Sequence, residues 1–348
     1  MSDSIDGLIE KVFHAWERRL VARTKDRVVR PFDWGLDWIE SNGHAPGTSP
    51  DIILRDWVSQ ALADSSRFFE TPDTSDYVFR PNADGGAISF PSALKTPQPE
   101  NNTVYGTYFR SVRHDRGHRA VVVLPQWNAG PEGHVGLCRL LNRFGVSALR
   151  LSLPYHDARK SPELSRADYI VSSNIARTVQ VCRQAVMDAR RAVAWLAKQG
   201  YERIGIVGTS LGSCLSLLTA AHEPRIRVQA LNHISPYFAD VVWRGLSTAH
   251  VRTGLDGSIR LDELRRMWLP ISPQSYLDRL GDTKTLLVYA KYDLTFPVDL
   301  SKNLVDEFRR RGLRHELSIL PCGHYSTGVA PFKYLDGFVL ARFLDRSL

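Results

Sequence analysis

The chain has 348 residues, of which 43% are hydrophobic and 24% charged, and its formal net charge is +8. This composition fits one large α/β domain with additions and requires no second full domain. The start of the chain lacks the apolar core of a signal peptide, and no stretch approaches the ~20 uncharged residues of a membrane span, so we expect a cytoplasmic protein. With neither an RNA-binding signature nor a lysine-rich tail, we expect no nucleic-acid partner.

Residues 1–102 precede the repeating pattern of the chain and predict an amino-terminal extension packed on the core. They open on an amphipathic helix whose apolar stripe includes Leu8, Val12 and Trp16. Its polar face carries charges of both signs, so we expect it to dock on its own protein rather than on a membrane. The tryptophans that follow add buried area or an interface, which keeps oligomerisation through the extension open. The proline-rich stretch 81–102 predicts an extended connector, and 103–112 predicts an edge strand.

Residues 103–348 form the predicted main domain, in which apolar runs alternate with amphipathic helical stretches from His118 onward. This alternation predicts an α/β fold with a mostly parallel central sheet and helices on both faces. The expected strands are 120–124, 146–153, 203–208, 228–234, 285–290 and 315–320. The expected helices are 134–144, 176–198, 213–221, 298–311 and 331–343. The arginines at 309–314 end one of these helices, where cations meet the helix dipole favourably.

Between the strand 203–208 and the helix that follows stands the pentapeptide Gly208-Thr209-Ser210-Leu211-Gly212. A strand, a sharp turn and a helix are the context of a nucleophile elbow, in which small flanking residues leave room for a strained serine. The pattern is weak by itself, because three fixed residues occur by chance in about one chain in ten of this size. With its context it predicts Ser210 as a catalytic nucleophile.

An insertion at about 236–282 interrupts the repeat and predicts a cap at the carboxyl ends of the strands. Its aromatic side chains could wall an apolar pocket for an acyl chain: Phe238, Trp243, Trp268 and Tyr276. A helical cover with no binding role is an equal alternative. The charges of the insertion balance, so it does not indicate an anionic ligand.

A serine hydroxyl needs a histidine base, and that base needs an acid to fix its tautomer. Asp293 follows the strand 285–290, and His324 follows the last strand directly after Gly323. The resulting order serine, acid, histidine matches one known arrangement of such triads. We therefore predict Asp293 as the acid and His324 as the base, with Asp240 as the alternative acid.

The developing oxyanion needs two backbone donors. One is predicted at Leu211, and the other in the loop after strand 120–124, at Trp127 or Gln126 with Trp127 favoured. The expected substrate contacts are loop and cap residues: His156, Arg159, Phe238 and Trp243. The four cysteines are far apart and lack metal-site spacing, and 114–118 is interpreted as a turn, so we predict neither a metal ion nor a cofactor.

With these residues in place, the chain from about Ala120 to Phe343 resembles the α/β-hydrolase superfamily, because GTSLG, YAKYD and CGHYS fall at its serine, acid and histidine positions. The stretches LPYHDARK and GHYSTG look like the group around α/β-hydrolase domain-containing protein 18. The resemblance implies a serine hydrolase acting on a small carboxylic ester or thioester that can carry an acyl chain. The alternatives are an acyltransferase with the same triad and an inactive binding or scaffold protein, which the atypical Pro-Gln-Trp loop motivates.

Overall fold

The computed structural model describes residues 2–40, 44–112 and 118–348, so residues 114–117 of the predicted turn lie outside it. Its centre is one sheet in the order β1-β2-β3-β5-β4-β6-β7-β8-β9. The strands are β1 (Val78–Asn82), β2 (Gly85–Pro91), β3 (Thr103–Phe109), β4 (Arg119–Leu124), β5 (Ser147–Leu151), β6 (Arg203–Thr209), β7 (Ile226–Asn232), β8 (Lys284–Ala290) and β9 (His315–Leu320). Neighbours from β5 to β9 pair in parallel, whereas β1, β2 and β3 are antiparallel to their neighbours. The predicted α/β class with a mostly parallel sheet is confirmed.

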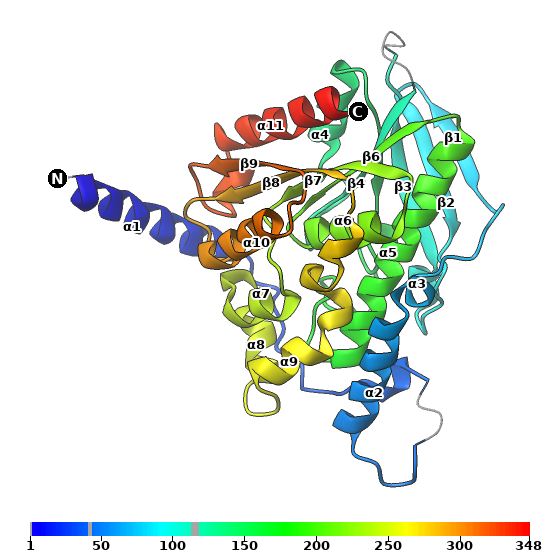
Figure 1. Ribbon diagram of the computed structural model, residues 1–348, viewed down its shortest axis with the longest axis vertical. Helices are drawn as coiled ribbons and strands as arrows, with labels where there is room; N and C mark the ends of the chain where they lie inside the picture. The colour runs from blue at the N-terminus through cyan, green and yellow to red at the C-terminus, as the bar shows by residue number, and fades with distance from the viewer. Residues whose placement is uncertain (1, 41–43, 113–117) are drawn as a thin grey trace.

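Helices cover both faces of this sheet (Figure 1). α4 (Val135–Arg143) and α11 (Phe332–Ser347) share one apolar cluster with one face, and α5 (Ile175–Lys198), α6 (Leu211–His222) and α10 (Val298–Arg310) share another with the opposite face. All six residues of β4 are buried, which explains why this strand is a continuous apolar run rather than an alternating one. The carboxyl ends of the parallel strands therefore form a rigid edge on which a site can be built.

The stretch predicted as an extended connector is structured differently, since its first part forms the end of a hairpin. β1 and β2 pair across a tight turn that ends at Gly85, and a Cβ there would lie 2.2 Å from the Tyr108 carbonyl oxygen. Pro81 is tolerated because β1 is the outermost strand and needs no partner on its free side. The prediction of an edge strand at 103–112 is wrong, because the β1–β2 hairpin extends the sheet and leaves β3 between β2 and β5.

The amino-terminal helix α1 (Ser2–Val21) projects from the body, and its second half packs on the α/β core (Figure 1). The ring of Phe13 stacks on Tyr292 with centroids 4.6 Å apart. Leu8 and Val12, on the projecting half, are 63% and 60% exposed. Two further helices of the extension, α2 (Pro50–Ala63) and α3 (Ser65–Phe68), lie against α5, α6 and the insertion. No helix in the described residues is long and apolar enough to cross a membrane.

The insertion after β7 is helical, with α7 (Phe238–Arg244), α8 (Ala249–Leu255) and α9 (Leu261–Met267) followed by two short 3-10 turns. Trp268 is fully buried, and its ring meets Phe238 edge to face at 5.4 Å. The indole N–H of Trp268 donates to the carbonyl oxygen of Ile175, which ties the insertion to α5. This part of the chain is therefore a packed cover at the strand ends.

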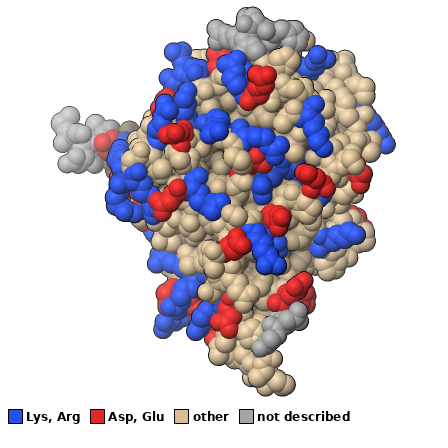
Figure 2. Space-filling model, turned by 45° about the vertical axis from the view of Figure 1, so that its right-hand side comes forward, with Lys and Arg blue, Asp and Glu red and all other residues tan. Residues whose placement is uncertain are grey.

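The arginines at 309–311, the densest basic run in the sequence, are paired with neighbouring carboxylates. Arg309 bonds Asp306 at 3.1 Å, while Arg310 and Arg311 share Glu307. Figure 2 shows acidic side chains interspersed among the basic ones over one face of the molecule. The net charge of +8 is thus not concentrated at the end of α10, where neighbouring carboxylates offset the arginines.

Candidate active site

Ser210 occupies the sharp turn between β6 and α6 with φ of 57° and ψ of −119°, a conformation that L-residues rarely adopt. A Cβ on Gly208 would lie 2.0 Å from the carbonyl oxygen of Gly212, and one on Gly212 would lie 2.1 Å from that of Leu124. Both glycines are therefore required by the close approach of the turn to its neighbours. The turn is held by a hydrogen bond from the Ser210 N–H to the Asn232 carbonyl oxygen, 2.7 Å long.

Asp293 and His324 come together at the ends of β8 and β9. The Nδ1 of His324 lies 3.0 Å from Oδ2 of Asp293, and Oδ1 accepts hydrogen bonds from the backbone N–H groups of Thr295 and Phe296. Burial raises the pKa of the Asp293 carboxyl, but His324 and the hydrogen bonds from His233 and His324 outweigh burial and hold the pKa below its usual value. An ionised Asp293 keeps the proton of His324 on Nδ1 and leaves Nε2 free to accept one.

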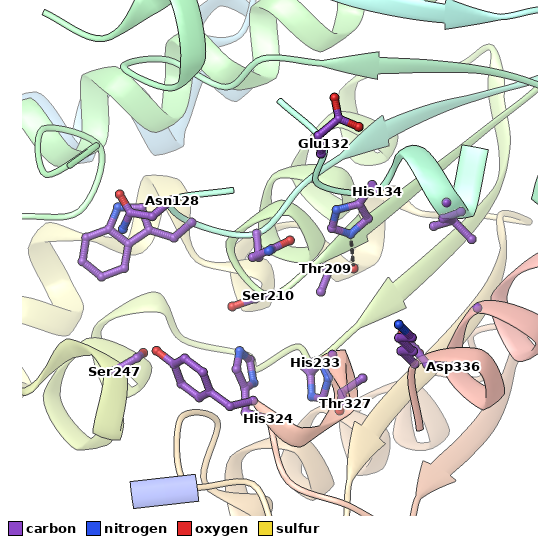
Figure 3. A pocket seen from close by; sticks show the side chains of 18 of the residues that line it. Asn128, Glu132, His134, Thr209, Ser210, His233, Ser247, His324, Thr327 and Asp336 are labelled. Atoms are coloured by element: carbon purple, nitrogen blue, oxygen red, sulfur yellow. Dashed lines mark hydrogen bonds between the residues drawn. The ribbon is translucent and has the colours of Figure 1, made fainter. Parts of the chain in front are cut away.

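Ser210 and His324 line one cavity of about 1140 Å³. Figure 3 shows both side chains at its centre, with His324 on the Ser210 side of His233. The imidazole of His324 stacks on the ring of Phe296, with centroids 5.3 Å apart and planes 6° from parallel. Stacking and the bond to Asp293 together restrict the ring to one orientation.

A second imidazole, that of His233, binds the same carboxylate oxygen. Its Nδ1 lies 2.9 Å from Oδ2 of Asp293, and its ring centroid lies 4.5 Å from that of His324. Burial, and secondarily the charge of His324, lower the pKa of His233, so this ring stays neutral. The expected strand 228–234 includes His233, but β7 ends at Asn232, and His233 is the first residue beyond it.

His233, Asp293 and His324 also form a group that could hold a metal ion, because one ligand atom from each lies within 4.8 Å of the others in the part of the chain that the structure describes. An ion there would require both rings to give up the Nδ1 protons that now bond Asp293. It would also take His324 away from its orientation by the acid. The geometry fits a shared hydrogen bond better than a metal centre.

The loop that carries His324 is held from α1, a connection that sequence reasoning missed. Glu17 is fully buried, and its carboxylate accepts hydrogen bonds from the backbone N–H groups of Tyr325 and Ser326 at 2.8 and 2.9 Å. A Cβ on Gly323 would lie 2.4 Å from the carboxyl carbon of Glu17. The glycine before His324 is thus needed for the approach of Glu17.

The loop after β4 brings Gln126 and Trp127 to the same cavity. The indole of Trp127 donates to the Ala167 carbonyl oxygen at 2.8 Å and stacks on His250 at 5.7 Å. Within the described residues, the backbone N–H groups of Trp127 and Leu211 have no hydrogen-bond acceptor. Trp127 and Leu211 line one cavity together with Ser210, so two free backbone donors lie near its wall.

Of the four predicted substrate contacts, only Phe238 lines a cavity next to Ser210. His156 is buried and uses both ring nitrogens within the protein, accepting from the Asn128 N–H at 2.9 Å and bonding the Pro154 carbonyl oxygen at 2.9 Å. His156 therefore shapes the loop that holds Trp127 instead of meeting a ligand.

Arg159 and Trp243 also lie away from the two cavities at Ser210. Arg159 is fully buried and pairs with Asp188 at 2.8 Å, so its charge is satisfied inside the core. The ring of Trp243 is covered by the guanidinium of Arg252 at 4.5 Å. The alternative acid Asp240 is paired with Arg265. Polar or aromatic character at a strand end does not by itself show which side chains face the cavity.

The structure can now be compared with solved ones. Acetyl xylan esterase 1 from Thermoanaerobacterium sp. JW/SL YS485 matches with a TM-score of 0.59 and 14% identity, over 90% of this chain and 99% of that one. The acetyl xylan esterase from Paenibacillus sp. R4 matches with a TM-score of 0.60 and 15% identity, over 88% and 98%. The chain has the α/β-hydrolase fold.

Pyrococcus horikoshii acylaminoacyl peptidase shares this α/β-hydrolase fold with a TM-score of 0.60 and 14% identity over 79% of this chain. The match covers 42% of the peptidase, so the chain spans about two fifths of its length. No protein-family model and no curated protein matches the sequence. The narrower likeness to the group around α/β-hydrolase domain-containing protein 18 stays a prediction.

Proposed function

We propose that the chain is a serine hydrolase that cleaves a carboxylic ester or thioester through an acyl-enzyme on Ser210. The hydrogen bond between Asp293 and His324, at the wall of the cavity that also exposes Ser210, carries the proposal. The fold is shared with two acetyl xylan esterases and a peptidase, which supports acyl chemistry at this sheet edge. Leu211 and Trp127 supply the oxyanion donors in this proposal.

In the acylation step, Oγ of Ser210 attacks the carbonyl carbon of the substrate while Nε2 of His324 takes the hydroxyl proton. The carbonyl oxygen becomes negative and is stabilised by the N–H groups of Leu211 and Trp127. The bond from carbon to the leaving oxygen or sulfur then breaks, and His324 returns its proton to that atom. The alcohol or thiol leaves, and the acyl group remains on Ser210.

In the deacylation step, His324 takes a proton from water, whose oxygen attacks the acyl-enzyme carbonyl. The ester bond to Ser210 breaks, Ser210 recovers its proton from His324, and the carboxylic acid leaves. Asp293 stays ionised throughout and stabilises the imidazolium that forms in each step. No group outside the chain is needed apart from substrate and water.

Two features favour hydrolysis over the alternatives. A cavity of about 1140 Å³ leaves room for water beside an acyl-enzyme, which an acyltransferase would have to exclude. The positive φ of Ser210 costs on the order of 1–3 kcal/mol, and a binding or scaffold protein has no need to maintain it. Both features support an active elbow.

A fluorophosphonate probe tests this proposal, because it forms a covalent bond only with an activated serine. We expect the wild type and the matched variant Ser216→Ala to be labelled, and Ser210→Ala to remain unlabelled. Ser216 is a fitting control because it is a buried serine of α6, the helix that follows Ser210, and lines neither cavity at Ser210. Absence of labelling in the wild type, or equal labelling of Ser210→Ala, overturns the proposal.

A further inference from the structure

Two cavities meet at Ser210, and they differ in size and in the chemistry of their walls. The smaller has a volume of about 50 Å³ and extends under the cap from Leu211 and Trp127. The larger has a volume of about 1140 Å³ and extends between the amino-terminal segment, α4 and α11. Consider an ester bound at Ser210, with its carbonyl oxygen at the backbone N–H groups of Leu211 and Trp127. Its acyl group and its alcohol group then lie in two different cavities.

The smaller cavity fits only a short apolar group. Its walls include the side chains of Phe238 and Val242 from α7 and of Phe296 from the loop after β8. Phe238 and Val242 are 7% and 2% exposed, so they are fixed within the packed cap. A single water molecule needs roughly 10–15 Å³ of such space, so a cavity of about 50 Å³ accepts only a few non-hydrogen atoms. That is the size of an acyl group with about two to four carbons.

The larger cavity has a polar wall opposite the cap. His134 Nε2 lies 2.9 Å from Oγ1 of Thr209, the residue before the nucleophile. Behind them, Asn232 donates to the same hydroxyl at 3.5 Å and to Oδ2 of Asp336 at 3.0 Å. Figure 3 shows His134, Thr209 and Asp336 on one side of Ser210, and Ser247 of the cap on the other. These four side chains form what we call the polar wall: His134, Thr209 and Asp336, which line the cavity, and Asn232 behind them.

The polar wall has hydrogen-bonding capacity that the protein does not use. Nδ1 of His134 and Oδ1 of both Asn232 and Asp336 are buried and have no partner among the described residues. Burial, and secondarily Arg150, lower the pKa of His134 to about 4, so its ring is neutral. Burial raises the pKa of Asp336 to about 7 against the hydrogen bond from Asn232, so its carboxyl can donate or accept near neutral pH. His134 and Asp336 line the cavity, so a ligand hydroxyl there can supply a missing partner.

The larger cavity is lined by equal numbers of acidic and basic side chains. Three acidic and three basic side chains line it: Asp26, Glu132, Asp336, Arg27, Arg166 and Lys333. One pair of them, Asp26 and Arg166, is already joined at 2.9 Å. A surface of this kind offers many hydrogen-bonding groups without favouring an anion or a cation. It fits a large, uncharged ligand that carries several hydroxyl groups.

We propose, on the basis of the function proposed above, that the substrate is a short-chain acyl ester of a bulky, uncharged, polyhydroxylated alcohol such as a sugar unit. The acyl group occupies the cavity at Phe238 and Val242, and the alcohol lies against the polar wall. The acyl carbon moves from the alcohol oxygen to Ser210 and then to water. The products are a short carboxylic acid and the free alcohol, whose hydroxyl takes up the proton carried by His324.

The acyl half of the proposal is tested with p-nitrophenyl acetate, butyrate and octanoate, which share one leaving group. We expect kcat/KM to be highest for acetate or butyrate and at least about 10-fold lower for octanoate. Equal or faster cleavage of octanoate overturns the inference while leaving the serine hydrolase intact. Failure to cleave any ester, together with absence of fluorophosphonate labelling, overturns the proposed function itself.

Val242→Ala sharpens this test, because it enlarges the small cavity. The ratio of octanoate to acetate kcat/KM is expected to rise at least about 5-fold. Val251→Ala is the matched control, since it makes the same change at a buried valine of the cap that does not line this cavity. An unchanged ratio in a folded Val242→Ala protein contradicts the assignment of the acyl site.

The alcohol half is tested with two acetates of similar shape, methyl 6-O-acetylglucoside and cyclohexylmethyl acetate. The acyl group and the ring size are the same, and only the sugar carries hydroxyl groups. We expect kcat/KM to favour the sugar ester by at least about 10-fold, and Asp336→Leu to reduce this preference. Equal rates for the two esters, or a preference that Asp336→Leu leaves unchanged, overturn the assignment of the polar wall.

Discussion

The residues proposed to react and the residues that hold them come from different regions of the chain. Ser210, Asp293 and His324 each stand just beyond a parallel strand, so the βα repeat brings them to one edge of the sheet. Glu17, which holds the loop of His324, comes from α1, outside that repeat. The repeat thus sets where the proposed catalytic groups lie, whereas the extension sets how firmly one of them is held.

Removing the proposed base, which the βα repeat positions, has the largest expected effect on activity. His324→Ala is expected to lower kcat/KM for p-nitrophenyl acetate by about 10⁴-fold or more, because the proposed base is lost. Steady-state hydrolysis measures this, and His315→Ala is the control because His315 lies at the start of β9, far along the strand from the site. A loss below about 10-fold in His324→Ala would remove this residue from the mechanism.

Weakening the contact that the amino-terminal extension makes with the His324 loop has a smaller effect, which is on kcat rather than on KM. Glu17→Gln keeps the size of the side chain but leaves a single acceptor for two N–H donors, so the loop of His324 loosens. We expect kcat to fall by roughly 10- to 100-fold with little change in KM, as for a catalytic group displaced by about 1 Å. Steady-state kinetics with p-nitrophenyl acetate measure kcat and KM separately and so check this prediction.

The control for Glu17→Gln is Glu10→Gln, which makes the same change at an exposed position of α1. Glu10→Gln should have wild-type kinetics. If Glu17→Gln lowers only the free energy of unfolding and leaves kcat unchanged, Glu17 has a structural role and does not position His324.

His233→Phe probes the second imidazole on Asp293. The variant keeps a ring but removes one hydrogen bond to the carboxylate, which lowers the free energy of unfolding at pH 7 by about 1–3 kcal/mol. Because the folded-state pKa of Asp293 is held low, this stabilisation is present above the unfolded pKa of about 3.9 and is lost as pH falls through the folded value. Urea unfolding at pH 7 and pH 3 should show the deficit shrinking with acid.

The effect of Asp336→Asn is expected to be on stability alone and to disappear in acid. The folded-state pKa of Asp336 is raised to about 7, so the native state is fully favoured below pH ~4 and loses stability as pH rises through 7. The shift sets an upper limit of roughly 4 kcal/mol on this loss. Asp336→Asn should therefore be more stable than the wild type at pH 8 and equal to it at pH 4, as measured by urea unfolding.

The part of the fold that could be predicted from sequence is the part with regular periodicity. Strands from residue 119 onward are short apolar runs between amphipathic helices, and their ends mark Ser210, Asp293 and His324. The hairpin of β1 and β2 could not be predicted, because its prolines argue against a strand and are tolerated only at the sheet edge. Proline content alone does not distinguish an edge strand from a connector.

Contacts between segments that are distant in the sequence could not be predicted either. Glu17 belongs to the polar residues of an amphipathic helix, and nothing in its neighbourhood in the sequence indicates that it is fully buried. His156 and Arg159 have the residue types of substrate contacts, yet both are enclosed by the protein. Burial of a polar side chain depends on partners that local sequence does not contain.

The bond between Glu17 and Tyr325 joins residues that lie 308 positions apart. During synthesis, α1 therefore leaves the ribosome long before the loop it will hold. Until that loop arrives, the Glu17 carboxylate lacks the two N–H donors that bind it in the folded chain. Closing so long a segment is slow, because its entropy is lost before the contact is gained. Appearance of activity during refolding should thus report the docking of α1, after most of the sheet has formed.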